Sequence, residues 1–407
     1  MAKSMVSGKP LSLMMQFALP LLLGNLLQQT YNIIDAAIVG QMLGDKALAG
    51  VGASSSIQFL VLGFCMGCCA GFGVPVAKYF GANDMHKMRK YIFNGAVLTG
   101  IIALIVTSVC AICCNQILHL LSVPQDIFDK AYSYLIVIFL GIPFTLMYNY
   151  LSSVLRSLGD SRTPFMFLAF SAILNIFLDL FCILVLKWGC AGAAIATITA
   201  QAVSGILCLV YIFKKVQIMH LEAQDREIEG SAVKELLVMG IPTGLQFSIT
   251  AIGSMVMQSA NNKLGSVYVS GFTAGMRIKQ FTMCPFDAFA TAASVFCSQN
   301  LGAGQAKRIK QGLSRYTERG AYGDTGTWIF RKSHILRCYR DGSQNHSEPG
   351  ICRSIWIYCH MFRRSDGMGY GDYIYIADMP LLCEEVHGEA CCGRVINLNL
   401  ILIFLIF

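Results

Sequence analysis

Three polar residues in otherwise apolar sequence have side chains and a spacing suited to binding a cation: Asp35, Asn175 and Asp179. Asn175 and Asp179 are four residues apart, so both would project from the same face of a helix. Carboxylate and amide oxygens are ligands for hard cations such as Na⁺, and a carboxyl group can instead hold a proton. The sequence therefore indicates a cation site, and the residues leave the choice between the two ions open.

The segment around Asp35 is long enough to cross a membrane. Leu11–Gly40 is almost entirely apolar, and about 20 apolar residues are enough to span a hydrocarbon core of roughly 30 Å. A carboxylate at membrane depth costs a few kcal/mol, so such a residue is a hypothesis for a functional site. The alternative is a hydrogen bond between helices that has no role in function.

Pro20 lies inside the same segment. A proline within a helix removes one backbone hydrogen bond and clashes with the preceding turn. In lipid this is tolerated only where neighbouring helices or water satisfy the freed carbonyl group. We expect Pro20 to kink this helix.

The composition is that of a polytopic membrane protein. Hydrophobic residues make up 55% of the chain and charged residues 13%, whereas about 25% of the residues in soluble domains are charged. The net charge of +8 comes without an aromatic-and-basic motif for RNA or DNA, so we expect no nucleic-acid partner. The clustered cysteines in apolar sequence, at 65–69 and 110–114, are expected to be small core residues rather than metal ligands.

Six apolar segments precede a charged linker. They are Leu11–Gly40, Ala47–Val76, Ile92–Cys114, Ala131–Leu151, Pro164–Leu186 and Ala191–Phe213. Fifteen lysines and arginines lie at the amino end and in the loops of the same side, and four lie in the opposite loops. The positive-inside rule then places the amino terminus in the cytoplasm.

The chain also contains an internal repeat. The sequence FALP at 17–20 matches MGIP at 239–242, so Pro242 repeats the expected kink at Pro20. When one residue is omitted from this alignment of the chain with itself, Gly81 aligns with Gly302, and two basic loops align without a gap. Chance similarity between apolar helices is the alternative, but the shared basic loop argues against it. The repeat is of the parallel kind, in which both copies start on the same side of the membrane.

Several stretches together resemble multidrug and toxic compound extrusion (MATE) transporters. They are the first helix with its early proline and late DAAIVG, the GAN and GAG basic loops, the turn RSLGDSRTP, the segment ILNIFLDLF, and GMRIKQF followed by QNLGAG. The resemblance covers residues 8–313. It implies an all-α polytopic fold with two six-helix lobes around a central cavity, and export of small organic cations by alternating access. Inward flow of Na⁺ or H⁺ would drive the export.

The resemblance also assigns residues. Asp35, Asn175, Asp179 and Thr197 match the cation-coupling site of the family, and the first three would bind Na⁺ if sodium is the coupling ion. Gln28 and Tyr134 match positions that line the neighbouring cavity. For Thr197 alone, a hydroxyl that only packs between helices is an equal alternative. No enzyme, resident cofactor or catalytic residue is implied. We expect a monomer in the inner (plasma) membrane.

The resemblance stops near residue 314. The sequence from there to about Arg394 is polar and has no helical or strand period, and the apolar end that follows is too short to span as an ordinary helix. The expected domains are 1–215, the first six-helix lobe; 216–313, a linker and the first two helices of a second lobe; 314–394, a polar segment unlike the family; and 395–407, the short apolar end. We hypothesise that the chain is out of frame from about residue 314.

Two alternatives to a drug exporter remain open. A lipid-linked oligosaccharide flippase of the same wider superfamily would be expected to line its cavity with several arginines and lysines that bind pyrophosphate, and the first six spans lack them. The other alternative is an inactive product that lacks four helices of its second lobe. An intramembrane enzyme is not favoured, because the apolar segments contain no motif such as HExxH.

Overall fold

The computed structural model describes residues 4–121, 123–262 and 266–320, and the regular elements in these ranges are helices. The long helices are α1 (Pro10–Leu43), α2 (Asp45–Gly81), α3 (Met85–Leu120), α4 (Gln125–Leu140), α5 (Ile142–Ser157), α6 (Arg162–Leu180), α7 (Gly189–Lys215), α8 (Gly230–Asn262), α9 (Ser266–Gly302) and α10 (Ala306–Gly320). Short helices are η1 (Phe181–Val185), η2 (Gln217–Met219) and η3 (Ala223–Arg226). Most of the sequence expected to be unlike the family, residues 321–407, lies outside the described residues.

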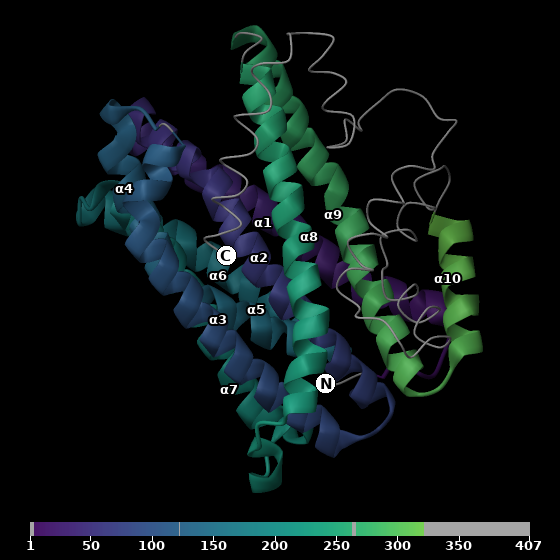
Figure 1. Ribbon diagram of the computed structural model, residues 1–407. Helices are drawn as coiled ribbons and strands as arrows, with labels where there is room; N and C mark the ends of the chain where they lie inside the picture. The colour runs from purple at the N-terminus through teal and green to yellow at the C-terminus, as the bar shows by residue number, and fades with distance from the viewer. Residues whose placement is uncertain (1–3, 122, 263–265, 321–407) are drawn as a thin grey trace, which may run out of the picture. The chain divides into compact units, whose positions relative to one another are not determined.

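The described helices confirm an all-α polytopic membrane protein (Figure 1). Six of them are long and apolar enough to cross a membrane, and α4 with α5 adds a seventh span if the bent pair crosses as one. Five of the single helices and the bent pair precede the linker, so the first lobe has its six expected spans. The division into domains at 215, 313 and 394 stays a prediction.

The fourth expected span is broken rather than straight. The sequence predicted one apolar segment over Ala131–Leu151, whereas α4 and α5 meet at Gly141 with a bend of 48°. A methyl group on Gly141 would overlap the side chain of Ile198 on α7. The bend therefore occurs where the backbone comes very close to a neighbouring helix, which the apolar sequence does not indicate.

Helix α2 packs against α3, α4, α5, α8 and α9. Its crossing with α8 is especially close, because a methyl group on Gly71 would lie 2.5 Å from the carbonyl oxygen of Met239. Small residues allow two helix backbones to approach in this way in a membrane. The thiols of Cys65, Cys68 and Cys69 are buried on the same helix, which confirms that this cluster belongs to the core.

Both expected kink prolines lie within continuous helices. Pro20 is in α1 and Pro242 is in α8, and each helix continues on both sides of its proline. The size of a kink at either position stays a prediction. Pro20 precedes Asp35 by fifteen residues, a rise of about 22 Å along the helix, so the proline does not take part in the cation site directly.

Candidate cation site

Four residues expected to form one site come together from three helices. Asp35 is on α1, Asn175 and Asp179 are on α6, and Thr197 is on α7. The side chain of Asp179 is fully buried and Asn175 is 3% exposed. The carboxyl groups of Asp35 and Asp179 are close enough for their charges to affect each other. Two acids 144 positions apart in the sequence are therefore neighbours.

Asn175 and Thr197 form the other half of this group. The amide Nδ2 of Asn175 donates a hydrogen bond of 3.5 Å to Oγ1 of Thr197. The Thr197 hydroxyl in turn donates to the carbonyl oxygen of Ala193, one turn earlier on α7, at 3.1 Å. The Asn175 amide therefore faces the Thr197 hydroxyl with its nitrogen, which leaves the amide oxygen for another partner.

Several oxygens of the group are buried without a hydrogen-bond donor among the described residues. They are Oδ1 of Asp35, Oδ1 of Asn175 and both carboxyl oxygens of Asp179. A buried polar atom without a partner costs about 1–3 kcal/mol, and two charged carboxylates at close range repel strongly in an apolar interior. The oxygens are a suitable donor set for Na⁺, and a shared proton would also remove the repulsion.

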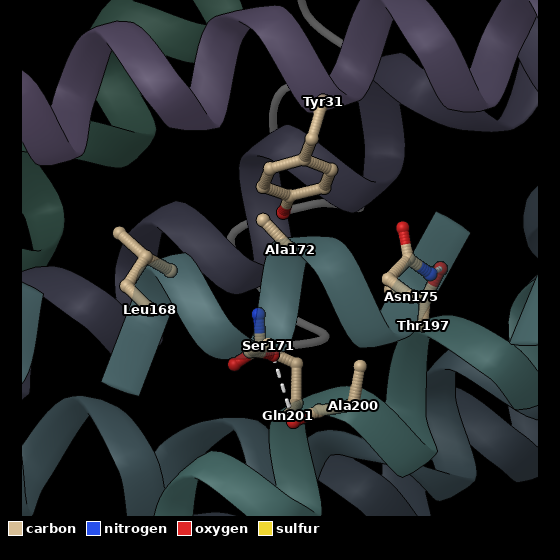
Figure 2. Close-up of a pocket in the computed structure, with 8 residues that line it drawn as sticks. All are labelled: Tyr31, Leu168, Ser171, Ala172, Asn175, Thr197, Ala200 and Gln201. Carbon is tan, nitrogen blue, oxygen red and sulfur yellow. Dashed lines mark hydrogen bonds between the residues drawn. The ribbon is translucent and has the colours of Figure 1, made fainter. Parts of the chain in front are cut away.

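A small cavity lies beside these residues, between α1, α6 and α7 (Figure 2). It is lined by Tyr31, Leu168, Ser171, Ala172, Asn175, Thr197, Ala200 and Gln201. Figure 2 shows Asn175 and Thr197 together on one side, Leu168 on the opposite side, and Ser171 and Gln201 between them. The Ser171 hydroxyl donates to the carbonyl oxygen of Ala200 at 2.8 Å. A small space lined by both polar and apolar side chains therefore adjoins the cation site.

Gln28 and Tyr134 are near the site but are not among the residues that line this cavity. Gln28 forms a side-chain hydrogen bond with Tyr31. Tyr134 is 4% exposed and lies close enough to Asp35 and Asp179 to be affected by their charges. Their expected role as cavity residues stays a prediction.

Three polar residues of the cavity, Tyr31, Ser171 and Gln201, were not predicted from the sequence. Each is separated by four positions from a residue that was expected: Tyr31 precedes Asp35, Ser171 precedes Asn175, and Gln201 follows Thr197. Residues four apart lie on the same helix face. A search for polar residues one turn from each expected ligand would have found all three.

Comparison with known proteins identifies the relatives of the chain. The family model MatE matches residues 20–181 and 242–317. A probable multidrug resistance protein of Bacillus subtilis, YpnP, is 34% identical over 308 residues, which span 76% of this chain and 69% of that protein. A second such protein from the same organism, YoeA, is 25% identical over 302 residues, 72% of this chain and 65% of that protein.

The fold is also that of a solved structure. A multidrug resistance MATE family transporter of the MOP superfamily, solved in an outward-facing conformation, matches with a TM-score of 0.73 and 21% identity. The match covers 77% of this chain and 70% of that one. The chain thus spans about two thirds of the length of its relatives, and the part that corresponds to their remaining third is not matched.

Proposed function

The chain belongs to the MatE family of membrane transporters, and on that premise we propose that it exports small organic cations in exchange for Na⁺ or H⁺. The observation that carries the proposal is the pair of carboxyl groups of Asp179, which is fully buried, and Asp35, which is half-buried, with the amide of Asn175 beside them. A site of this kind inside a lipid-embedded lobe is suited to reversible binding of a monovalent cation.

Binding of the cation would change the force between two helices. Asp35 is on α1 and Asp179 is on α6, and these helices pack against each other. When both carboxylates are charged and no cation is bound, their repulsion favours separation of the helices. A bound Na⁺ or a proton removes that repulsion. The position of α1 therefore depends on occupancy of the site, and α1 also packs against α9.

This dependence gives a route from ion binding to alternating access. Helix α9 is the second helix of the second repeat, so a shift of α1 would act on the other half of the molecule. A ligand moves a conformational equilibrium only through its different affinity for the two states. Here the difference comes from the distance between the two carboxyl groups, which is short in the state that binds the ion.

The finer assignments of substrate and location rest on the family and on charge. The names of two relatives, which are probable multidrug resistance proteins, support a drug-like cargo, and the family resemblance suggests that the cargo is cationic. The excess of lysine and arginine in one set of loops supports a cytoplasmic amino terminus in the inner membrane. We propose a monomer without a resident cofactor or a catalytic residue. Since the family match ends at residue 317, the test uses this chain and a frame-corrected version, which we call the restored chain.

The experiment is export of ethidium from cells that express either version. Asp179→Asn keeps the size of the side chain but removes the charge, and we expect at least a tenfold loss of export. Asp129→Asn is the matched control, because Asp129 is an exposed carboxylate on α4. Variation of external sodium and pH in the same assay identifies the coupling ion. If Asp179→Asn in the restored chain exports ethidium as well as the wild type does, the proposed cation site is wrong. If the restored wild type does not export ethidium, the proposed organic-cation cargo is wrong.

A further inference from the structure

The ends of α2 and α9 cross without space for a side chain. A methyl group on Gly81, at the end of α2, would overlap the carbonyl oxygen of Gln299 on α9. A methyl group on Gly302, at the end of α9, would overlap the carbonyl oxygen of Lys78 on α2. These are the two glycines that the repeat places at equivalent positions, and the contact is reciprocal. The two repeats therefore meet here through backbone.

A residue from the amino-terminal segment is inserted beside this crossing. Met5 is 3% exposed, whereas Ser4 and Ser7 on either side of it are exposed. The backbone N–H of Met5 donates to Oε1 of Gln299 at 2.7 Å. The Met5 carbonyl oxygen accepts from Nδ2 of Asn300 at 3.2 Å. The single buried residue of this segment is thus bonded on both sides to the end of α9.

Further contacts connect the same group to the first repeat and to α10. Gln299 is fully buried, and its Nε2 donates to the carbonyl oxygen of Ser157, at the end of α5, at 2.8 Å. Arg308 of α10 donates to the carbonyl oxygen of Met5 at 3.3 Å. One amide side chain, that of Gln299, therefore joins the amino-terminal segment to the first repeat.

We propose that residues 4–9, together with Gln299 and Asn300, form a latch that holds this end of the molecule closed. We call this group the Met5 latch. Separation of α2 from α9 requires the two glycine contacts to break. Gln299 would then leave either Ser157 or Met5, since it bonds to both. Opening at this end thus breaks at least one of the two hydrogen bonds of Gln299, and the amino-terminal segment regulates how easily opening occurs.

The inference rests on the proposed function only in assigning the latch to a transport cycle. The latch itself is measured without a transport assay. The measurement is amide hydrogen exchange of the purified protein in lipid nanodiscs, followed by mass spectrometry. The segments compared are 4–9, the end of α2 at 78–84 and the end of α9 at 295–304. Residues 131–140 of α4 serve as a distant reference.

Gln299→Ala is expected to increase exchange in all three segments together. The variant loses one hydrogen bond to Met5 and one to Ser157. A net hydrogen bond contributes about 1 kcal/mol, so we expect amide exchange to become about tenfold faster in each segment. Gln311→Ala is the matched control, because Gln311 is an exposed amide side chain on α10. A second pair avoids reliance on one variant: Met5→Asp places a charge at the buried position, and Ser7→Asp places it at an exposed one.

Faster exchange of the three segments in Gln299→Ala and Met5→Asp, with no change in the two controls, supports the Met5 latch. Unprotected residues 4–9 in the wild type would overturn it. So would a response limited to residues 4–9, because that segment would then be docked without holding α2 to α9. Loss of the Asp179→Asn effect on export would reject the cation site and leave the exchange result intact.

Discussion

The linker between the repeats contains a buried ionic contact whose removal has a calculable effect. Asp225 is on η3 and its side chain is fully buried. Its Oδ2 accepts from Nε of Arg89 at 2.6 Å and from the backbone N–H of Glu222 at 2.9 Å. Nδ1 of His86 lies 2.6 Å from the other carboxyl oxygen. We predict that Asp225→Ala opens the linker.

The size of the effect follows from burial. Removal of one partner from a buried ion pair costs about 3–5 kcal/mol where the other charge is left uncompensated. The cost is smaller here, because Nη2 of Arg89 stays paired with Oε1 of Glu222 at 2.9 Å. We expect a cost of at least about 1.4 kcal/mol, which makes local opening of the linker at least about tenfold more frequent. Glu227→Ala is the control, since the side chain of Glu227 is 71% exposed and lies 3.5 Å from Lys90. An exposed pair contributes about 0–1 kcal/mol.

The assay is amide hydrogen exchange across residues 216–229 at several pH values, corrected for the intrinsic rates. Burial acts to raise the pKa of Asp225, but hydrogen bonds from the Glu222 N–H, Arg89 and His86 outweigh it and lower the pKa below its ordinary value. A lowered pKa in the folded state gives stability that is complete above the ordinary value of about 4. It is lost as the pH falls through the lowered value.

In Asp225→Ala the amides of residues 216–229 should therefore be less protected from exchange at pH 7 than in the wild type. Their protection should not vary over the acidic range in which the wild type loses protection. Equal protection of Asp225→Ala and the wild type at pH 7 would refute the reasoning. A similar loss in Glu227→Ala would also refute it, because the effect would then belong to charge in general rather than to the buried contact.

Two further predictions concern packing in the first lobe. Gly71→Leu should destabilise the protein by at least about 1–3 kcal/mol, because the new side chain would overlap the backbone of α8. Gly100→Leu should not destabilise it, because the space around Gly100 is open. Thermal unfolding in detergent compares the two variants. Tyr150→Phe removes a buried hydrogen bond of 2.6 Å to the carbonyl oxygen of Ile92 and should cost about 1–2 kcal/mol. The same unfolding assay checks it against Tyr132→Phe, where the ring is 38% exposed, and equal melting temperatures would contradict the prediction.

The spans and the main residues of the cation site could be predicted from the sequence because both depend on the cost of polar groups in lipid. Apolar runs of this length are typical of membrane spans, and an acid such as Asp35 within one of them is conspicuous. The Asn175 and Asp179 spacing then places two ligands on one helix face. What brings Asp35 beside Asp179 is the packing of α1 on α6, and a single sequence does not contain that information.

Other features depend on contacts between distant segments. The bend at Gly141 is in a continuous apolar run and is associated with the close approach of Ile198 on another helix. Asp225 is one of several charges in a linker, and what distinguishes it is its burial against Arg89, 136 residues away, and His86. Met5 is one apolar residue in a short polar segment. Its burial depends on Gln299, 294 residues later.

The central claim is that Asp35 and Asp179 act as one cation-binding unit that drives export. The most direct measurement is ethidium transport into the lumen of proteoliposomes under an imposed Na⁺ or proton gradient, for Asp35→Asn, Asp179→Asn and the double variant of the restored chain. Residues that act as one unit are not additive, so we predict that each single variant loses gradient-driven transport and that the double variant is no worse. Full gradient-driven transport by either single variant would contradict the claim.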